Sequence, residues 1–410
     1  MPRLSIREKC KINTNYSADT FVGIQSVDGD ISINFPVGFN LSDDDKGLRR
    51  DIILLMNGLR HHTSREESTI SNDRVDDSTV EFPFEAYLAV LADFFGRGYF
   101  KENEVAYNFS KRGKINWNRT IKNCKPVIQN NTVYYLDFVT KRSRVNDDEL
   151  ITLIHEFCVY ESFEKVGWIF TSTMPKQPRI KYNYRLFKGV LLKKISETFN
   201  DRNRELFNYM LAIVEYQGND NPSHTYMFGT SQFEYVWESM IDRIYGIVNK
   251  SDYFPKTSWL LPNRYNNAVL KPDTIMVHNN DIFILDAKYY KFGYSRFAGD
   301  LPESASINKQ ITYGEYVAET ERFREIHGEE MHVYNAFLLP FDSKVWNQDT
   351  IYRFGEAVGD WKTGDKTYEK IQGILVDVKS LMESSLRNEH ARIKEMAELI
   401  ERAVLGEEND

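Results

Sequence analysis

Two aspartates and a lysine lie inside apolar segments where the interior of a β-sheet would normally carry Val, Ile or Phe. Asp273 belongs to the first segment, "LKPDTIMV", whereas Asp286 and Lys288 belong to the second, "IFILDAKYY". Asn279-Asn280 between them can supply the two positive φ angles of a tight turn. A hairpin that turns there places Asp273 opposite Asp286, with Lys288 two residues further along on the same face.

This arrangement favours a metal site, because opposed carboxylates repel and are costly to bury without compensation. A cation with oxygen ligands removes that cost, and Mg²⁺ typically uses one or two carboxylates together with phosphate and water. Lys288 could orient an attacking water or stabilise charge that develops on a phosphate. The residues therefore predict Mg²⁺-dependent hydrolysis of phosphodiesters, with Mn²⁺ as a substitute. The alternative is a structural edge hairpin with an Asp286–Lys288 ion pair, for which "IFILDAKYY" is too apolar.

The hairpin resembles that of the PD-(D/E)xK nuclease superfamily, and in particular the LlaJI-type and McrC-type restriction endonuclease subunits. The upstream segment "FGTSQFEYVWESMIDRIYG" resembles the helix that delivers a further carboxylate, which is either Glu234 or Glu238. Downstream, "INKQITYGEYV" resembles the Gln/Tyr helix of these nucleases, which implies that Gln310 and Tyr313 lie near the metal or the phosphate. The segment "SKRGKINWNRTI" resembles a Gly-x-Ile-x-Trp block of LlaJI-type proteins.

The resemblance implies a restriction endonuclease that cleaves foreign double-stranded DNA in a bacterial defence system. The implied metal ligands are Asp273, Asp286 and Glu238. McrC-type subunits act with an AAA+ GTPase or ATPase, and this chain contains no GxxxxGK[ST] motif, so another polypeptide would supply nucleotide hydrolysis. Because each chain would carry one site, cutting both strands implies a homodimer or sequential nicking.

Two basic stretches are candidates for a DNA-binding surface, although the net charge of −8 argues against binding through overall charge. Residues 107–125 and 174–194 contain no acidic residue and interleave their basic residues with aromatic ones. Segregated positive charge of this kind suits contact with phosphate. The alternative is a pair of solvated loops and strands. The candidate residues in the two stretches are Lys111, Arg112, Lys114, Arg119, Lys176, Arg179 and Lys181.

The patterns of apolar residues predict an α/β (α+β) fold. In its second half they predict helix 231–249, strands 269–277 and 282–289, helix 308–326 and strand 332–339. That order indicates a mixed central sheet flanked by helices, as in a restriction-endonuclease-like domain. Upstream they predict a largely helical mixed region that includes helix 195–217 and strand 132–139.

These elements divide the chain into four predicted parts. An N-terminal segment, 1–75, precedes a mixed and partly basic domain, 80–220, that binds DNA or a partner. The nuclease domain spans 222–365. The remainder, 366–410, is predicted to be an acidic tail that is helical from about 366 to 405.

Several other classes of protein are excluded or disfavoured. Three widely spaced cysteines provide no disulfide framework and no zinc motif, and the N-terminus has no signal-peptide core, so we expect a cytoplasmic protein without a membrane span. The histidines match no metalloenzyme spacing, and His155 is expected on a helix face. Two functional alternatives stay open: a non-catalytic subunit that binds DNA or a partner, and a repair or transposition nuclease on the same fold.

Overall fold

The computed structural model describes residues 5–16, 19–27, 30–63, 83–146, 149–171, 173–218, 226–260, 265–266, 269–387 and 391–406. The chain forms two compact units. Unit 1 comprises Met1–Thr79 together with His224–Asp410, and unit 2 comprises Val80–Ser223. The N-terminal segment and the second half of the chain therefore belong to the same unit.

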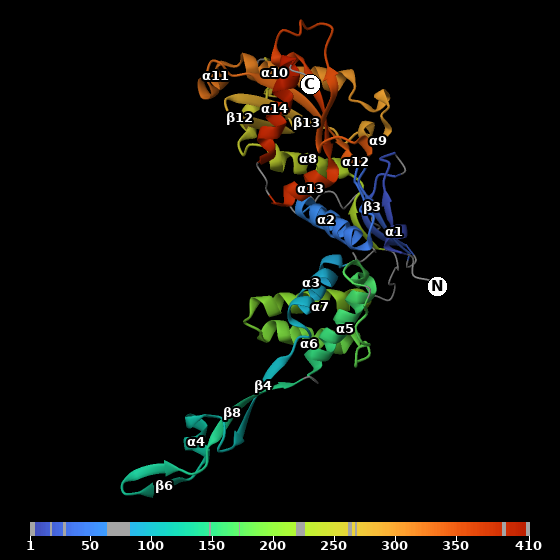
Figure 1. Cartoon of the computed structure of the whole chain (residues 1–410). Coiled ribbons are helices and arrows are strands. Elements are labelled where there is room, and N and C mark those ends of the chain that lie inside the picture. Colours follow the sequence, from blue (N-terminus) through green and yellow to red (C-terminus); the bar gives the residue numbers. More distant parts are fainter. Residues whose placement is uncertain are drawn as a thin grey trace. The chain divides into compact units, whose positions relative to one another are not determined.

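The centre of unit 1 is a five-stranded mixed sheet (Figure 1). Its order is β12 (Thr274–His278), β13 (Asp281–Ala287), β14 (Val333–Phe341), β16 (Ile371–Asp377) and β15 (Ile351–Ala357). The three inner strands are parallel, and each edge strand is antiparallel to its neighbour. The inner strands are apolar along almost their whole length because helices cover both faces of the sheet.

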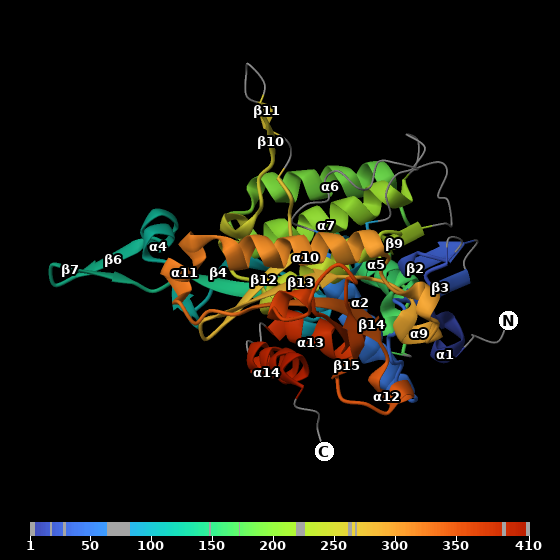
Figure 2. The same cartoon turned by 90° about the horizontal axis from the view of Figure 1, so that it is seen from above.

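Helices on both faces position the sheet. Figure 2 shows α10 (Ser304–Glu319) on one face, and α13 (Val378–Arg387) and α14 (Ala391–Leu405) on the opposite side. Helix α8 (Phe233–Tyr245) packs against α13, α14, β12 and β13. The apolar stripe of α8, which includes Phe233, Trp237 and Met240, is fully buried. Helical spacing of these residues explains why α8 forms here.

A second, four-stranded sheet in unit 1 leads directly into α8. Its order is β1 (Cys10–Ile12), β3 (Asp30–Phe35), β2 (Val22–Val27) and β9 (Tyr226–Thr230). Strands β2 and β9 meet at Gly23 and Gly229, where a Cβ on Gly23 would lie 2.2 Å from the Phe228 carbonyl oxygen. Glycine is required at such a close approach. Because β9 ends three residues before α8 begins, the N-terminal sheet fixes the start of that helix.

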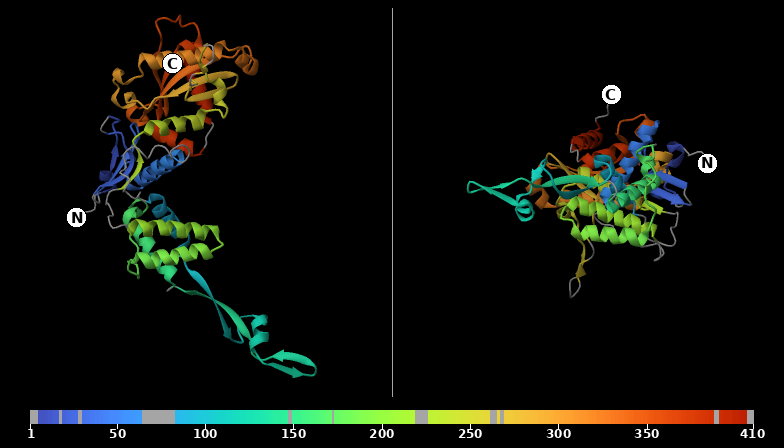
Figure 3. Two further views of the ribbon diagram at one scale, coloured as in Figure 1. Left: turned by 180° about the vertical axis from the view of Figure 1, so that it is seen from behind. Right: turned by 90° about the horizontal axis from the view of Figure 1, so that it is seen from below.

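Unit 2 combines four helices with a long two-stranded ribbon, which Figure 3 shows from two further sides. The helices are α3 (Phe84–Arg97), α5 (Leu150–Lys165), α6 (Tyr184–Glu197) and α7 (Asp201–Gln217). The ribbon pairs β4 (Glu102–Phe109) with β8 (Val139–Asn146). At the ribbon's far end lie β5 (Lys114–Ile115), α4 (Trp117–Asn123), β6 (Pro126–Gln129) and β7 (Thr132–Tyr135). We call residues 107–141 the arm.

The remaining elements belong to unit 1, except for η1 in unit 2. The helices are α1 (Ile6–Lys9), α2 (Asp45–Thr63), α9 (Phe292–Ser295), α11 (Glu321–His327) and α12 (Ser343–Trp346). The 3-10 helices are η1 (Gly167–Ile169), η2 (Lys250–Tyr253), η3 (Ala298–Asp300) and η4 (Thr367–Glu369), and β10 (Ser258–Trp259) pairs with β11 (Tyr265–Asn266). No helix in the described ranges combines the length and the apolar character that crossing a membrane requires.

The α+β fold is confirmed, but several predicted elements are wrong. The helical tail predicted from about 366 contains β16, an inner strand, and becomes helical only at Val378. The helix predicted at 195–217 begins at Asp201, because the Asn200 side chain caps it, and the separate helix α6 was missed. The predicted strand 132–139 breaks after Tyr135. The predicted helix 308–326 is two helices, because α10 ends at Glu319 and α11 begins at Glu321.

The expected place of His155 on a helix is confirmed, and this residue makes the stability of unit 2 depend on pH. It is fully buried on α5, where its Nδ1 accepts a hydrogen bond of 2.8 Å from the Phe100 N–H. Burial lowers the pKa of His155 from 6.5 to about 4. Between pH 6.5 and pH 4 the His155 side chain binds a proton in the unfolded state but not in the folded state. The folded state is therefore most stable above pH 6.5 and loses stability as the pH falls toward 4.

We therefore expect the free energy of unfolding of unit 2 to fall by about 2 kcal/mol between pH 7 and pH 5 through this residue. The measurement is urea unfolding of the wild type and of His155→Gln at both pH values, followed by circular dichroism. The variant should lose most of the difference between the two pH values. An equal difference in both proteins would contradict the assignment.

Candidate functional site

The predicted pairing of the hairpin strands is confirmed. Thr274 pairs with Leu285 and His278 with Asp281, so Asp273, one residue before β12, faces Asp286. The turn differs in one detail, because within Asn279-Asn280 only Asn279 has a positive φ, of 54°. The two aspartates lie on the sheet face covered by α10, since the alternation of side chains groups them with buried neighbours such as Ile284.

Short contacts tie Asp273, Asp286 and Lys288 together. One Asp273 carboxylate oxygen accepts a hydrogen bond of 3.0 Å from the N–H of Ala287. The Lys288 ammonium lies 2.6 Å from an Asp286 carboxylate oxygen. Asp286 is buried, whereas Asp273 and Lys288 are partly buried. The three predicted residues are therefore assembled at one end of the hairpin.

Several negatively charged side chains lie close together around Asp273 and Asp286. Burial and the charges of Asp286 and Glu238 raise the pKa of Asp273 to about 8. Burial opposes the charge of Lys288, but the contact with Asp286 outweighs it and raises the pKa of the lysine. Lys288 is thus a fixed cation beside carboxylates whose combined ionisation is unfavourable.

Helix α8 adds a third carboxylate. Burial and the charge of Asp286 raise the pKa of Glu238, and the charge of Glu238 in turn helps to raise the pKa of Asp273. The charge of Glu234, one turn earlier, makes a smaller contribution to the raised pKa values of Tyr289 and Glu238. Between the two candidates the structure favours Glu238 as the helix acid next to the aspartates.

Asp242 and Lys250 were not predicted as site residues, yet they connect α8 to the hairpin. The Lys250 ammonium lies 2.8 Å from an Asp242 carboxylate oxygen and donates a hydrogen bond of 2.6 Å to the Asp273 carbonyl. Asp242 lies one turn after Glu238, and its carboxylate also accepts a hydrogen bond from Thr274. Asp242 continues the i, i+4 series of acids, which is a signal the sequence offers, whereas nothing local marks Lys250.

We expect Lys250→Ala to lower the free energy of unfolding by about 1 kcal/mol, because the ion pair and the bond to the Asp273 carbonyl are lost together. Thermal unfolding of the full chain measures this. Lys256→Ala, at an exposed lysine in the loop that follows, is the matched control. Identical midpoints for the two variants would show that Lys250 does not hold the hairpin.

The two residues of α10 that the resemblance implies lie near the site are both buried. Gln310 is buried, and its amide donates hydrogen bonds to the Ile284 carbonyl at 2.7 Å and to Asn335 at 3.3 Å. It therefore fixes α10 to β13 near Asp286, and its contact with metal or phosphate stays a prediction. Tyr313 is 1% exposed, within the core against Ile284, so it is not an available DNA contact. Lys309 is exposed on this helix, and its ammonium lies 5.5 Å from the centre of the Tyr313 ring.

The donor atoms fit a hard divalent cation, although no complete cage exists. Within the described part of the chain, no three His, Cys, Asp or Glu side chains are arranged to hold a metal ion by themselves. The predicted set of three carboxylates is therefore not assembled as a finished site. Asp273 and Asp286 supply facing oxygen ligands, and Mg²⁺ commonly uses two carboxylates and completes its shell with water and phosphate.

The predicted DNA-binding residues lie in unit 2. Lys111, Arg112, Lys114 and Arg119 are all exposed on the arm, where the Arg119 guanidinium lies 3.7 Å from the centre of the Tyr107 ring. In the second stretch Lys176 and Lys181 are exposed too. Arg179 forms two hydrogen bonds of 3.0 and 2.8 Å with Glu156, which offsets its charge, and its contact with DNA stays a prediction.

The arm also exposes apolar side chains. Trp117 is 54% exposed and packs edge-on against Phe138, and Ile128 is 72% exposed. Trp117 is therefore not a core residue. Exposed aromatic and basic residues together are typical of a surface that binds a macromolecule.

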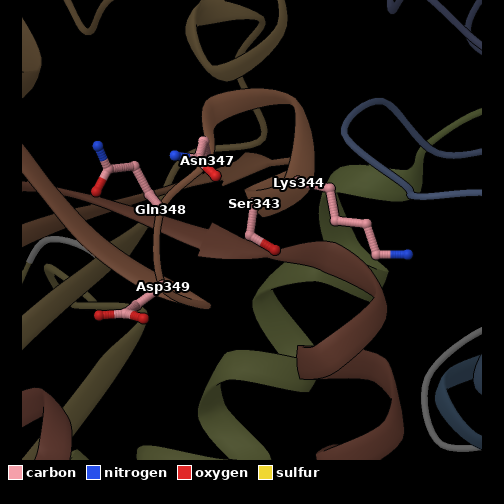
Figure 4. A pocket seen from close by; sticks show the side chains of 5 residues that line it. All are labelled: Ser343, Lys344, Asn347, Gln348 and Asp349. Carbon is pink, nitrogen blue, oxygen red and sulfur yellow. The ribbon is translucent and has the colours of Figure 1, made fainter.

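A cavity of about 480 Å³ lies away from the predicted residues. Figure 4 shows its lining, which comprises Ser343, Lys344, Asn347, Gln348 and Asp349. It contains a single carboxylate and none of the predicted site residues. The paired carboxylates, not this cavity, carry the chemistry that the sequence predicts.

Comparison with known proteins identifies the family. A family model described as LlaJI restriction endonuclease matches residues 21–358, which is most of the chain. The chain belongs to the LlaJI restriction endonuclease family.

The similar proteins include a curated relative and a solved structure. The YdjA component of the type II restriction enzyme BsuMI from Bacillus subtilis (strain 168) is 27% identical over 290 residues, which is 64% of this chain. The match spans 58% of that relative's length. Among solved structures, a complex of Thermococcus gammatolerans McrB AAA+ hexamers with bound McrC has 15% identity and a TM-score of 0.35, covering 90% of this chain and 82% of that one.

Proposed function

We propose that the chain is a Mg²⁺-dependent endonuclease that hydrolyses phosphodiester bonds of foreign double-stranded DNA. The observation that carries this proposal is the facing pair Asp273 and Asp286 with Lys288 held against Asp286 at 2.6 Å. A structural hairpin gains nothing from two facing acids in a largely apolar sheet, whereas a metal site requires them. Membership of a restriction endonuclease family supports the same reaction.

In this proposal each residue has a distinct task. Asp273 and Asp286 hold the cation, with Glu238 acting from α8. When bound, Mg²⁺ supplies positive charge that offsets charge developing on the scissile phosphate. Lys288 stabilises the same charge and orients the attacking water. The bond from the Ala287 N–H keeps the Asp273 carboxylate at the hairpin end, where the phosphate would enter.

DNA and a second polypeptide are the proposed partners. The basic arm is proposed to contact DNA phosphates through Lys111, Arg112, Lys114 and Arg119. A separate AAA+ NTPase subunit follows from the resemblance of the sequence to McrC-type subunits, because this chain lacks a nucleotide-binding motif. Two copies of the chain, or two successive nicks, would cut both strands.

A second candidate function is a non-catalytic subunit that binds DNA or a partner. The arm favours it, since exposed Trp117 and Ile128 lie beside the basic residues. In that case the Asp286–Lys288 ion pair would only stabilise the hairpin, and Asp273 would serve only to accept a hydrogen bond from the Ala287 N–H.

Incubation with plasmid DNA separates the two candidates. Purified protein is mixed with supercoiled plasmid in Mg²⁺, in Mn²⁺ and in EDTA, with and without an AAA+ NTPase that copurifies with it. We expect nicked or linear products in either metal and none in EDTA. Cleavage in EDTA, or binding without cleavage under every condition, would reject the nuclease.

A further inference from the structure

Tyr289 directly follows Lys288 and is enclosed by two distant parts of unit 1. Its hydroxyl accepts a hydrogen bond of 2.9 Å from the Val37 N–H, and its carbonyl accepts one of 3.0 Å from the Asn15 side-chain amide. Both donors belong to the N-terminal sheet region. The Tyr289 side chain is buried, so the bond from the Val37 N–H is shielded from solvent, whereas the bond from Asn15 is partly buried.

The ring of Tyr289 also contacts the helix that carries the third carboxylate. Its centroid lies 5.1 Å from that of Phe233 and 6.3 Å from that of Trp237, and these residues immediately precede Glu234 and Glu238 on α8. Tyr289, two residues after the end of β13, therefore contacts both α8 and the N-terminal sheet region.

A shared acceptor joins the same elements at the backbone. The Leu338 carbonyl on β14 accepts hydrogen bonds from the Lys288 N–H at 2.9 Å and from the Trp237 indole N–H at 3.2 Å. The backbone of Lys288 and the middle of α8 are thereby fixed to one atom. A shift of Tyr289 would be transmitted to Lys288 through one peptide bond and to α8 through Phe233 and Trp237.

We propose that Tyr289 is a positioning residue through which the N-terminal sheet region sets the geometry of Lys288 and Glu238. The proposal rests on the proposed function for its activity readout. It gives the first 40 residues a task in catalysis although they contribute none of the candidate acids or bases. Displacement of a catalytic group by about 1 Å can cost a factor of 10² in rate, so a loosened connection should be measurable.

Tyr289→Phe tests the proposal because it keeps the ring against α8 and removes only the acceptor of the Val37 N–H. Tyr182→Phe in unit 2 is the matched control, since the Tyr182 hydroxyl donates a 2.8 Å hydrogen bond to the Val214 backbone carbonyl. Cleavage is measured in Mg²⁺ well below the unfolding temperature of each protein. We expect kcat of Tyr289→Phe to fall about tenfold or more with KM for DNA within about twofold, and Tyr182→Phe to match the wild type.

A milder variant guards against misfolding. Asn15 has a φ of 52°, which glycine tolerates, so Asn15→Gly removes the donor to the Tyr289 carbonyl without backbone strain. We expect a loss of kcat in the same direction. Unchanged kcat in both variants, or an equal loss in Tyr182→Phe, would overturn the proposal.

Hydrogen exchange tests, independently of catalysis, whether Tyr289 connects the N-terminal sheet region to Lys288 and α8. In Tyr289→Phe, the Lys288 amide and the first turns of α8 should exchange faster than in the wild type, with α5 of unit 2 unchanged. If the wild type cleaves no DNA, the proposed function fails while this comparison still tests the connection. Exchange rates equal to wild type at Lys288 and α8 would overturn it.

Discussion

Replacing Asp286 by asparagine is expected to lower the rate of DNA cleavage by about 10³-fold and to leave DNA retention within about twofold. The substitution preserves the shape of a buried side chain and removes the charge that faces Asp273 and pairs with Lys288. Lys288→Ala should have a comparable effect, because it removes the fixed cation that lies 2.6 Å from Asp286. Single-turnover cleavage of a labelled duplex, beside filter retention in Ca²⁺, measures both quantities.

Asp281→Asn is the matched control for this prediction. Asp281 lies on the same strand at the turn end, where it accepts a hydrogen bond of 2.8 Å from the His332 N–H. Its loss should alter stability slightly and leave the cleavage rate unchanged. Equal activity of Asp286→Asn and Asp281→Asn would show that the carboxylates of Asp273 and Asp286 serve the fold and not cleavage.

Stability gives a second view of the same residues. Burial and neighbouring negative charge disfavour ionised Asp273, so Asp273→Asn should unfold at the same temperature as the wild type or a higher one when no divalent cation is present. It should also be inactive. A residue that served the fold alone would show the opposite, with a lower unfolding temperature and intact activity.

Reversing the charge of Lys111, Arg112 and Lys114 to glutamate is expected to weaken DNA binding by two orders of magnitude or more at about 0.1 M salt. All three side chains are exposed on the arm, so each can neutralise a phosphate without first breaking an internal contact. The dependence of log affinity on log salt should flatten by about 0.9 for each lost contact. Fluorescence anisotropy of a labelled duplex over a range of NaCl concentrations measures the slope.

Arg179→Ala serves as the comparison for the arm variant. Arg179 is a basic residue of the second stretch whose charge is offset by Glu156, so its removal should leave the salt slope unchanged. If the triple variant also retains the wild-type slope, the arm binds a protein or is merely solvated. Loss of stimulation by an NTPase partner in that variant would then identify a protein contact.

The hairpin was predictable because its signals are local. Alternating side chains and an asparagine turn fix which residues pair, so the opposition of Asp273 and Asp286 followed from residues 270–291 alone. The helix preceding the hairpin was equally evident from its apolar stripe. Charged residues in an apolar context then indicated chemistry before any fold was known.

Other features depend on packing between distant segments. The β16 segment "IQGILVD" is a short apolar run whose periodicity does not separate a buried strand from part of a helix. Resemblance to the family placed Gln310 and Tyr313 near the site but gave no indication that both are buried, since that depends on how α10 meets β13. Tyr289 and its donor Val37 are separated by 252 positions, a contact for which the sequence carries no local pattern.

Binding of Mn²⁺ to the protein, followed by the loss of the free-ion electron paramagnetic resonance signal, tests the central claim most directly. With a duplex DNA carrying uncleavable phosphorothioate linkages, the wild type should bind the ion saturably. Asp286→Asn should lose that binding, and Asp281→Asn should keep it. Equal binding by the wild type and Asp286→Asn, or no binding by the wild type with DNA present, would contradict a metal site at the end of this hairpin.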